Sequence, residues 1–195
     1  MNEFDKYFND NEFTNKAMER YNALDDGIKK RLDELSEKDI DEYQLNVIKR
    51  KRVIPEKGDL FLVSPVRNIF FWGVVINSGV SAPEGDDLIV VFILKDKAAS
   101  LNDVNVPKSV TNLLIEPAIV EKWYWNKGFF FNVGLSIDIP KNLDYGFYSV
   151  ANRKYVDEYK KTIPKQPEIC GTYGVCTGSG VAYEMNRELI IEGLI

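Results

Sequence analysis

The chain has 195 residues, of which 45% are hydrophobic and 28% are charged, a composition typical of a globular protein that buries a core. Its net charge is -5, which argues against a nucleic-acid partner because phosphate contacts need clustered lysine and arginine. The chain contains no histidine, which excludes Ser-His-Asp and Cys-His catalytic groups and histidine metal sites.

The N-terminus, Met1-Asn2-Glu3-Phe4-Asp5, is acidic and lacks the basic and apolar regions of a secretory signal. No apolar run approaches the length of a membrane span. We therefore expect a cytoplasmic protein with no membrane contact. Residue composition changes near residue 54, from mainly charged residues to short apolar runs. This change predicts an N-terminal helical region, 1–53, packed on a core domain, 54–195.

Apolar residues in the first region recur at spacings of three and four, which predicts an amphipathic helix. They are Phe13, Ala17, Tyr21, Leu24, Ile28, Leu32 and Leu35. Gly27 interrupts this stripe, and Ser36 can cap a second helix with Asp39 three residues on. We interpret both helices as covering the sheet rather than as a dedicated binding element.

The basic run 49–52, Lys-Arg-Lys-Arg, has two interpretations. It can be a nucleic-acid patch, or the solvated end of the second helix, where positive charge suits the helix dipole. We favour the helix end because the chain as a whole is acidic.

Short apolar runs dominate the sequence after Pro55 and predict strands at 60–63, 69–76, 88–94 and 113–120. Gly73 marks a bulge or a close backbone approach, and 78–87 reads as a turn-rich loop. Residues 123–125 are predicted as a further strand, with 129–133 pairing back across a turn at 126–128. A final helix is expected over 179–192, capped by Ser179 and stopped by Gly193. The predicted fold class is α+β, with a curved antiparallel sheet or partly open barrel as its core.

No cofactor or metal site is predicted. Cys170 and Cys176 lie six residues apart, which fits neither a Cys-x-x-Cys motif nor a zinc site, so we interpret them as inert thiols. The glycine-rich stretch 171–180 lacks the Gly-Lys-Ser/Thr of a phosphate cradle and reads as a flexible turn. Acidic residues near predicted strand ends (Asp86, Asp87, Glu116, Glu121 and Asp138) fit an acidic surface better than a metal site.

Three tryptophans stand out as large aromatic side chains: Trp72, Trp123 and Trp125. On a strand, Trp123 and Trp125 would share one face and Tyr124 would lie on the other. Core packing and an anchor at a protein interface both fit this pattern.

A series of short motifs runs in a fixed order along the core domain. They are Gly58-Asp59-Leu60-Phe61-Leu62-Val63, Phe71-Trp72-Gly73-Val74-Val75, Leu113-Leu114-Ile115-Glu116-Pro117, Trp125-Asn126-Lys127-Gly128-Phe129-Phe130-Phe131-Asn132-Val133-Gly134, Tyr155-Val156-Asp157-Glu158-Tyr159 and Tyr173-Gly174. Together, over roughly residues 50–190, they resemble the immunity protein 26 family of bacterial polymorphic-toxin and contact-dependent inhibition systems.

The resemblance implies a protein that binds and neutralises a cognate secreted toxin by occluding its active site, with no catalytic residues of its own. A basic nuclease is one such partner, and an acidic protein would be steered towards it. We expect the partner-binding residues in the 78–87 loop and around 123–127. They are Glu84, Asp86, Asp87, Glu121, Trp123, Tyr124, Trp125 and Lys127.

Two alternatives stay open. A strand that opens with Gly-Asp also begins the SH3-like barrels of PemK- and MazF-type endoribonucleases, in which case Asp59 and Arg67 would carry the chemistry. The chain can also be a small-ligand or scaffold module, which a deep apolar pocket would favour.

Overall fold

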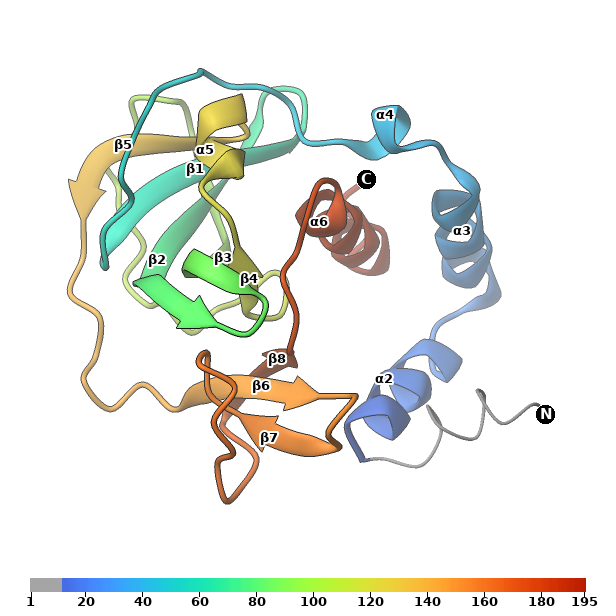
Figure 1. The fold of residues 1–195 in the computed structure, drawn as a ribbon. Coiled ribbons are helices and arrows are strands. Elements are labelled where there is room, and N and C mark those ends of the chain that lie inside the picture. The colour runs from blue at the N-terminus through green and yellow to red at the C-terminus, as the bar shows by residue number, and fades with distance from the viewer. Residues whose placement is uncertain (1–11) are drawn as a thin grey trace.

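The computed structural model describes residues 12–195, and its centre is an open, curved antiparallel sheet in the order β4-β3-β2-β1-β5 (Figure 1). The strands are β1 (Asp59–Val66), β2 (Ile69–Ala82), β3 (Gly85–Ala98), β4 (Ala118–Val120) and β5 (Phe130–Ser136). The predicted α+β class is confirmed, with helices before the sheet and one after it. Within the described residues the sheet does not close into a barrel.

The middle strands are apolar on both faces, which explains why they form the centre of the sheet. Leu60 through Val63 on β1 are fully buried, and so is nearly all of the run 88–94 on β3. The prediction that 88–94 is a central strand is confirmed, since β3 lies between β2 and β4.

Gly73 marks a close approach, as the sequence predicts. It pairs with Phe61, and a Cβ added to it would lie 2.2 Å from the Phe61 ring. The register between β2 and β3 also shifts between Phe71 and Gly73, so this point carries an irregularity as well.

Each face of the sheet is covered by a different layer. On one face, α6 (Gly180–Ile191) and the short helix α5 (Trp123–Lys127) bury Val181, Met185, Tyr124 and Trp125 against Phe61. On the other face lies a small sheet in the order β7-β6-β8. Its strands are β6 (Tyr145–Ser149), β7 (Lys154–Val156) and β8 (Ile169–Thr172), with β6 parallel to β8.

The N-terminal helices are α2 (Glu12–Asn22), α3 (Asp26–Glu37) and α4 (Ile40–Tyr43). α3 packs on α6 through Leu32, Leu35 and Ile190, and α6 packs on the sheet in turn. The helices therefore reach the sheet through α6 (Figure 1). No helix among residues 12–195 is both long and apolar enough to span a membrane.

The breaks between these helices differ from the prediction. The stripe divides before α3, where Asp25 accepts a hydrogen bond from the Ile28 N–H at 2.9 Å, and Gly27 lies inside α3. The second helix is capped by Asp39 and Glu42 rather than by Ser36.

The basic run 49–52 is not a helix end, because the helix stops at Tyr43 and residues 44–56 are not helical. This segment is bound to the sheet instead. The Asn46 N–H donates to the Ser64 carbonyl, and the Ile48 N–H donates to the Gly128 carbonyl, both at 2.8 Å.

The prediction of a long loop at 78–87 is wrong. β2 and β3 continue to a two-residue turn at Pro83 and Glu84, with irregular register on the way. Asp87 adopts a left-handed φ of 57°, which aspartate tolerates better than most residues.

The predicted strand at 129–133 is found as part of β5, but the strand predicted at 123–125 and its pairing across the turn are wrong. Residues 123–127 form α5, which ends at Gly128 with a left-handed φ of 83°. β5 then pairs with β1 rather than back across the turn, with Phe131 opposite Leu62. The final helix is confirmed as α6, followed by Gly193.

Candidate functional site

The turn between β2 and β3 brings the predicted acidic residues to one end of the sheet. Ile89 on β3 pairs with Val120 on β4, so Glu121 follows beside the start of β3. We call Glu84, Asp86, Asp87 and Glu121 the acidic end, and all four are exposed. Lys122 lies next to them, with its Nζ 3.2 Å from Asp87 Oδ2.

Glu84 anchors the turn to the small sheet. Its carboxylate accepts hydrogen bonds from the Lys160 ammonium and, at 2.6 Å, from the Tyr173 hydroxyl. Desolvation acts to raise the pKa of Glu84, but the bonds from Lys160 and Tyr173 outweigh it and hold the pKa below its usual value. Burial and the Glu84 carboxylate raise the pKa of Tyr173. The turn is therefore held in place while Asp86, Asp87 and Glu121 face solvent.

The aromatic residues predicted for the same surface divide between core and surface. Tyr124 and Trp125 are each 1% exposed, and the Tyr124 ring stacks on Phe130 at 4.7 Å. Core packing is thus what the structure shows for these two residues. Trp123 is half-buried two residues after Glu121, and Lys127 is exposed at the other end of α5.

The helical state of 123–127 has a sequence signal in Gly128. A glycine directly after a basic residue is a common helix stop, and the Gly128 N–H donates to the Trp125 carbonyl at 2.9 Å. In the sequence this signal is outweighed by Trp123, Tyr124 and Trp125, because tryptophan and tyrosine favour strands.

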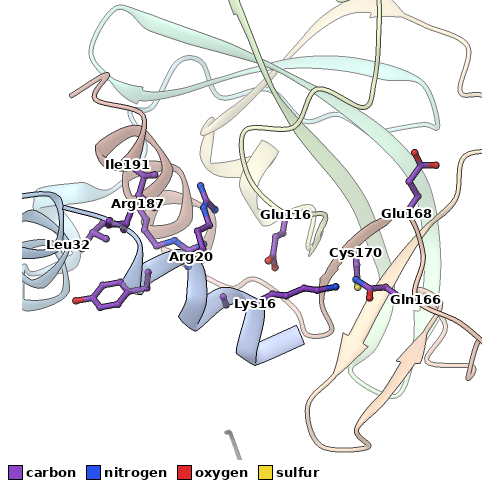
Figure 2. Close-up of a pocket in the computed structure, with 12 residues that line it drawn as sticks. Lys16, Arg20, Leu32, Glu116, Gln166, Glu168, Cys170, Arg187 and Ile191 are labelled. Atoms are coloured by element: carbon purple, nitrogen blue, oxygen red, sulfur yellow. The ribbon is translucent and has the colours of Figure 1, made fainter. Parts of the chain in front are cut away.

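A second candidate site is a cavity of about 340 Å³ between α2 and the body of the protein (Figure 2). One end of it is apolar, with Leu32 and Ile191, and the other end carries Glu116, Cys170 and Gln166. The remaining lining residues are Lys16, Ala17, Arg20, Tyr21, Leu24, Glu168 and Arg187.

Ion pairs join α2 to α6 beside this cavity. The Arg20 guanidinium contacts both carboxylate oxygens of Glu188, at 3.0 and 2.5 Å. Arg187 contacts Glu184 and Glu188 at 3.0 Å each. The Arg187 Nε is buried and has no hydrogen-bond partner among the described residues. The Glu184–Arg187 spacing is typical of an ion pair on one helix, whereas the Arg20–Glu188 pair joins residues 168 positions apart and leaves no local sequence pattern.

The pKa values of four acidic and thiol groups in or near the cavity are raised above their ordinary values. Desolvation, followed by the nearby Glu184 carboxylate, raises the pKa of Glu116. Desolvation also raises the pKa of Glu184. Burial raises the pKa of Cys170 to about 12 and that of Cys176 to about 11, so both thiols stay protonated at neutral pH and are poor nucleophiles.

The endoribonuclease alternative requires Asp59 and Arg67 to meet. Asp59 begins β1 and Arg67 follows its end, eight residues later, which places them about 25 Å from each other along an extended strand. Asp59 is engaged locally, since its carboxylate accepts a hydrogen bond from Asn132 Nδ2 at 2.9 Å. Arg67 is exposed in the turn that follows β1. These two residues therefore do not form one site.

Within residues 12–195, no group of three or more cysteine or acidic side chains is placed to hold a metal ion. Comparison with protein-family models, with curated proteins and with solved structures gives no match for this chain.

Proposed function

We propose that the protein is a stoichiometric inhibitor of a basic protein toxin, of the immunity-protein kind that the sequence resembles. The observation that carries the proposal is the acidic end, where the exposed Asp86 and Asp87 of β3 lie beside Glu121, which follows β4. A net charge of -5 adds long-range attraction towards a basic partner.

The geometry of the turn supports such a role. Glu84 is fixed by Lys160 and Tyr173, which limits the freedom of the turn before binding and lowers the entropic cost of ordering it. Trp123, half-buried and two residues after Glu121, supplies a large side chain that packs on Phe129, with the ring centroids 5.4 Å apart.

The mechanism is occlusion. The acidic end would lie over the cationic active-site groove of the toxin, where its carboxylates take the place of substrate phosphates. The inhibitor itself needs no chemistry for this, and complementary charge would set the association rate and the salt dependence.

The experiment is co-expression with the variable C-terminal domain of a large secreted protein encoded next to this chain. We expect co-purification in equal amounts and rescue of cells from that domain's toxicity. If the two proteins neither co-purify nor show rescue, the inhibitor proposal is wrong. Cleavage of RNA by the purified chain alone would instead favour the endoribonuclease alternative.

The cavity under α2 favours a second candidate function, a small-ligand module. Its apolar end at Leu32 and Ile191 and its polar end at Glu116 and Cys170 would suit an amphipathic molecule. Thermal stabilisation by members of a metabolite library, lost in a Leu32→Asp variant that still folds, would support this function. Stabilisation that survives this substitution would count against it.

A further inference from the structure

A basic hollow of about 390 Å³ lies at the end of α5 opposite the acidic end, and the proposed function does not use it. Two segments far apart in the sequence line it. Arg50 and Arg52 come from the non-helical segment before β1, and Asn126 and Lys127 come from α5.

Backbone contacts fix the two segments relative to each other. The Ile48 N–H donates to the Gly128 carbonyl at 2.8 Å. A Cβ on Gly128 would lie 2.8 Å from the Lys49 carbonyl carbon and 2.9 Å from the Arg50 nitrogen, so only glycine permits this approach. The cations of the hollow are therefore mounted on a backbone that is already ordered.

Among the described residues, the cations of the hollow have no acidic partner. None of its four lining residues is acidic, and within residues 12–195 neither Arg50, Arg52 nor Lys127 forms an ion pair. The arginines Arg20 and Arg187 of the same chain are both paired with carboxylates. Three like charges held together without a counterion repel one another, and an anion placed between them removes that repulsion.

The end of α5 does not cancel this positive charge. The last carbonyls of a helix carry partial negative charge, which would repel an anion. Here the Trp125 carbonyl accepts the Gly128 N–H at 2.9 Å, and the Tyr124 carbonyl accepts the Phe129 N–H at 3.0 Å.

The side chains in the hollow suit an oxyanion. Arg50 and Arg52 both line it, whereas Lys51 between them does not. Two guanidinium groups offer planar pairs of donors that match phosphate oxygens, and Lys127 and the Asn126 amide add further donors. A single hollow on an otherwise acidic chain fits one compact anion better than a nucleic-acid strand, which needs a continuous basic track.

We propose that the basic hollow binds a phosphate group, either as inorganic phosphate or as the phosphate monoester of a small organic molecule. This site is independent of the inhibitor proposal.

The test follows backbone amide signals by NMR during titration with inorganic phosphate at constant ionic strength, and again with methyl phosphate. We expect saturable shifts centred on Arg50, Arg52, Lys127 and Gly128. Arg50→Gln and Arg52→Gln should each weaken binding about tenfold, because each removes charge-assisted hydrogen bonds to the anion. The same spectra report whether each variant is folded. If an arginine variant does not fold, Lys127→Gln takes its place, because Lys127 also lines the hollow.

Lys51→Gln is the matched control, since it removes the same charge from the same segment but outside the hollow. It should change the affinity by less than about twofold. Equal weakening by Lys51→Gln, shifts that do not saturate, or shifts centred elsewhere would overturn the proposal. The proposal would also be overturned if a short single-stranded oligonucleotide displaced phosphate and shifted amide signals well beyond the hollow. Methyl phosphate binding as tightly as inorganic phosphate points to a monoester, and much weaker binding points to the free ion.

Discussion

Glu188 shows at the scale of single residues how charge is accommodated inside this protein. Its side chain is only 7% exposed, and Arg20 and Arg187 approach it from two helices. A buried carboxylate in this position is tolerated because both of its neighbours carry positive charge.

Glu188→Gln should lower the free energy of unfolding by about 2 kcal/mol, a value below that of a fully buried pair because Arg20 is half exposed. Urea denaturation measures this loss. The control is Glu192→Gln, which breaks an exposed pair with Lys95 and should cost less than about 1 kcal/mol. Equal losses for the two variants would contradict this account of the Glu188 cluster.

Glu116 leads to a pH prediction. Its pKa is raised in the folded protein, mainly by desolvation and then by Glu184, so folding favours its protonated form. The stabilisation from this proton is present below the ordinary value of 4.5 and is lost as pH rises through the raised pKa.

Glu116→Gln should therefore leave stability nearly unchanged below about pH 4 and increase it by less than about 1 kcal/mol at about pH 7.5, because the wild-type carboxylate is ionised there at a cost that its solvent exposure keeps small. Urea denaturation at both values measures the difference. Glu19→Gln, which alters an exposed carboxyl on α2, is the control. A gain that is the same at both pH values, or a loss at the higher one, would show that the assigned shift is wrong.

At the scale of elements, the pairing of β1 with β2 depends on Gly73 because the Phe61 ring lies across it. Gly73→Ala should lower the free energy of unfolding by about 2 kcal/mol or more, since the new methyl group would overlap a buried aromatic ring. Gly174→Ala, where nothing lies within 4 Å of the added Cβ, should stay within about 0.5 kcal/mol. Chemical denaturation measures the loss in free energy of unfolding for both variants. Equal losses would contradict this account of the packing.

The attachment of the segment before β1 to α5 can be tested with two glycines that share a left-handed backbone. Gly128 has a φ of 83° and meets the Lys49–Arg50 backbone, whereas Gly193 has a φ of 66° and open space around it. Both alanine variants lose the freedom of glycine, but only Gly128→Ala also creates a clash. Its thermal or chemical stability should fall at least about 1 kcal/mol further than that of Gly193→Ala. Equal stability would mean that the contact with residues 49–50 is loose.

The elements that the sequence predicts well are those with one dominant local signal. The run 88–94 is apolar at every position, and the final helix has an apolar stripe followed by Gly193, so both are confirmed. Residues 123–127 are mispredicted because Trp and Tyr favour strands. Their helix packs against Phe130 on β5 and Val181 on α6, and neither contact is visible in the local sequence. The basic run 49–52 is mispredicted for a similar reason, since the bonds that hold its segment come from Ser64 and Gly128.

The candidate site divides in the same way. The acidic residues 84–87 could be found from the sequence because exposed charge is readable from composition and from nearby turn residues. Their meeting with Glu121 depends on the pairing of β3 and β4, and the burial of Tyr124 and Trp125 depends on the helix α5. Neither is a local property, so the sequence could not show that two of the eight predicted residues are buried in the core.

At the scale of the whole molecule, the acidic end and the basic hollow lie apart. The acidic end follows the turn between β2 and β3, while the basic hollow lies at the far end of α5. A basic partner should approach the acidic end and be repelled from the hollow, which gives the complex a preferred orientation.

The most direct test of the inhibitor account is the affinity of this chain for its toxin domain, measured by titration calorimetry for the wild type and two charge-reversal variants. The first variant combines Asp86→Lys with Asp87→Lys, and the second combines Glu34→Lys with Glu37→Lys on the exposed face of α3. Both change the net charge equally, so they separate a local contact from general attraction. We predict that the first variant binds at least about tenfold more weakly than the wild type and that the second changes affinity by less than about threefold. Unchanged affinity in the first variant, or an equal loss in both, would contradict the assignment of the acidic end as the toxin-binding surface.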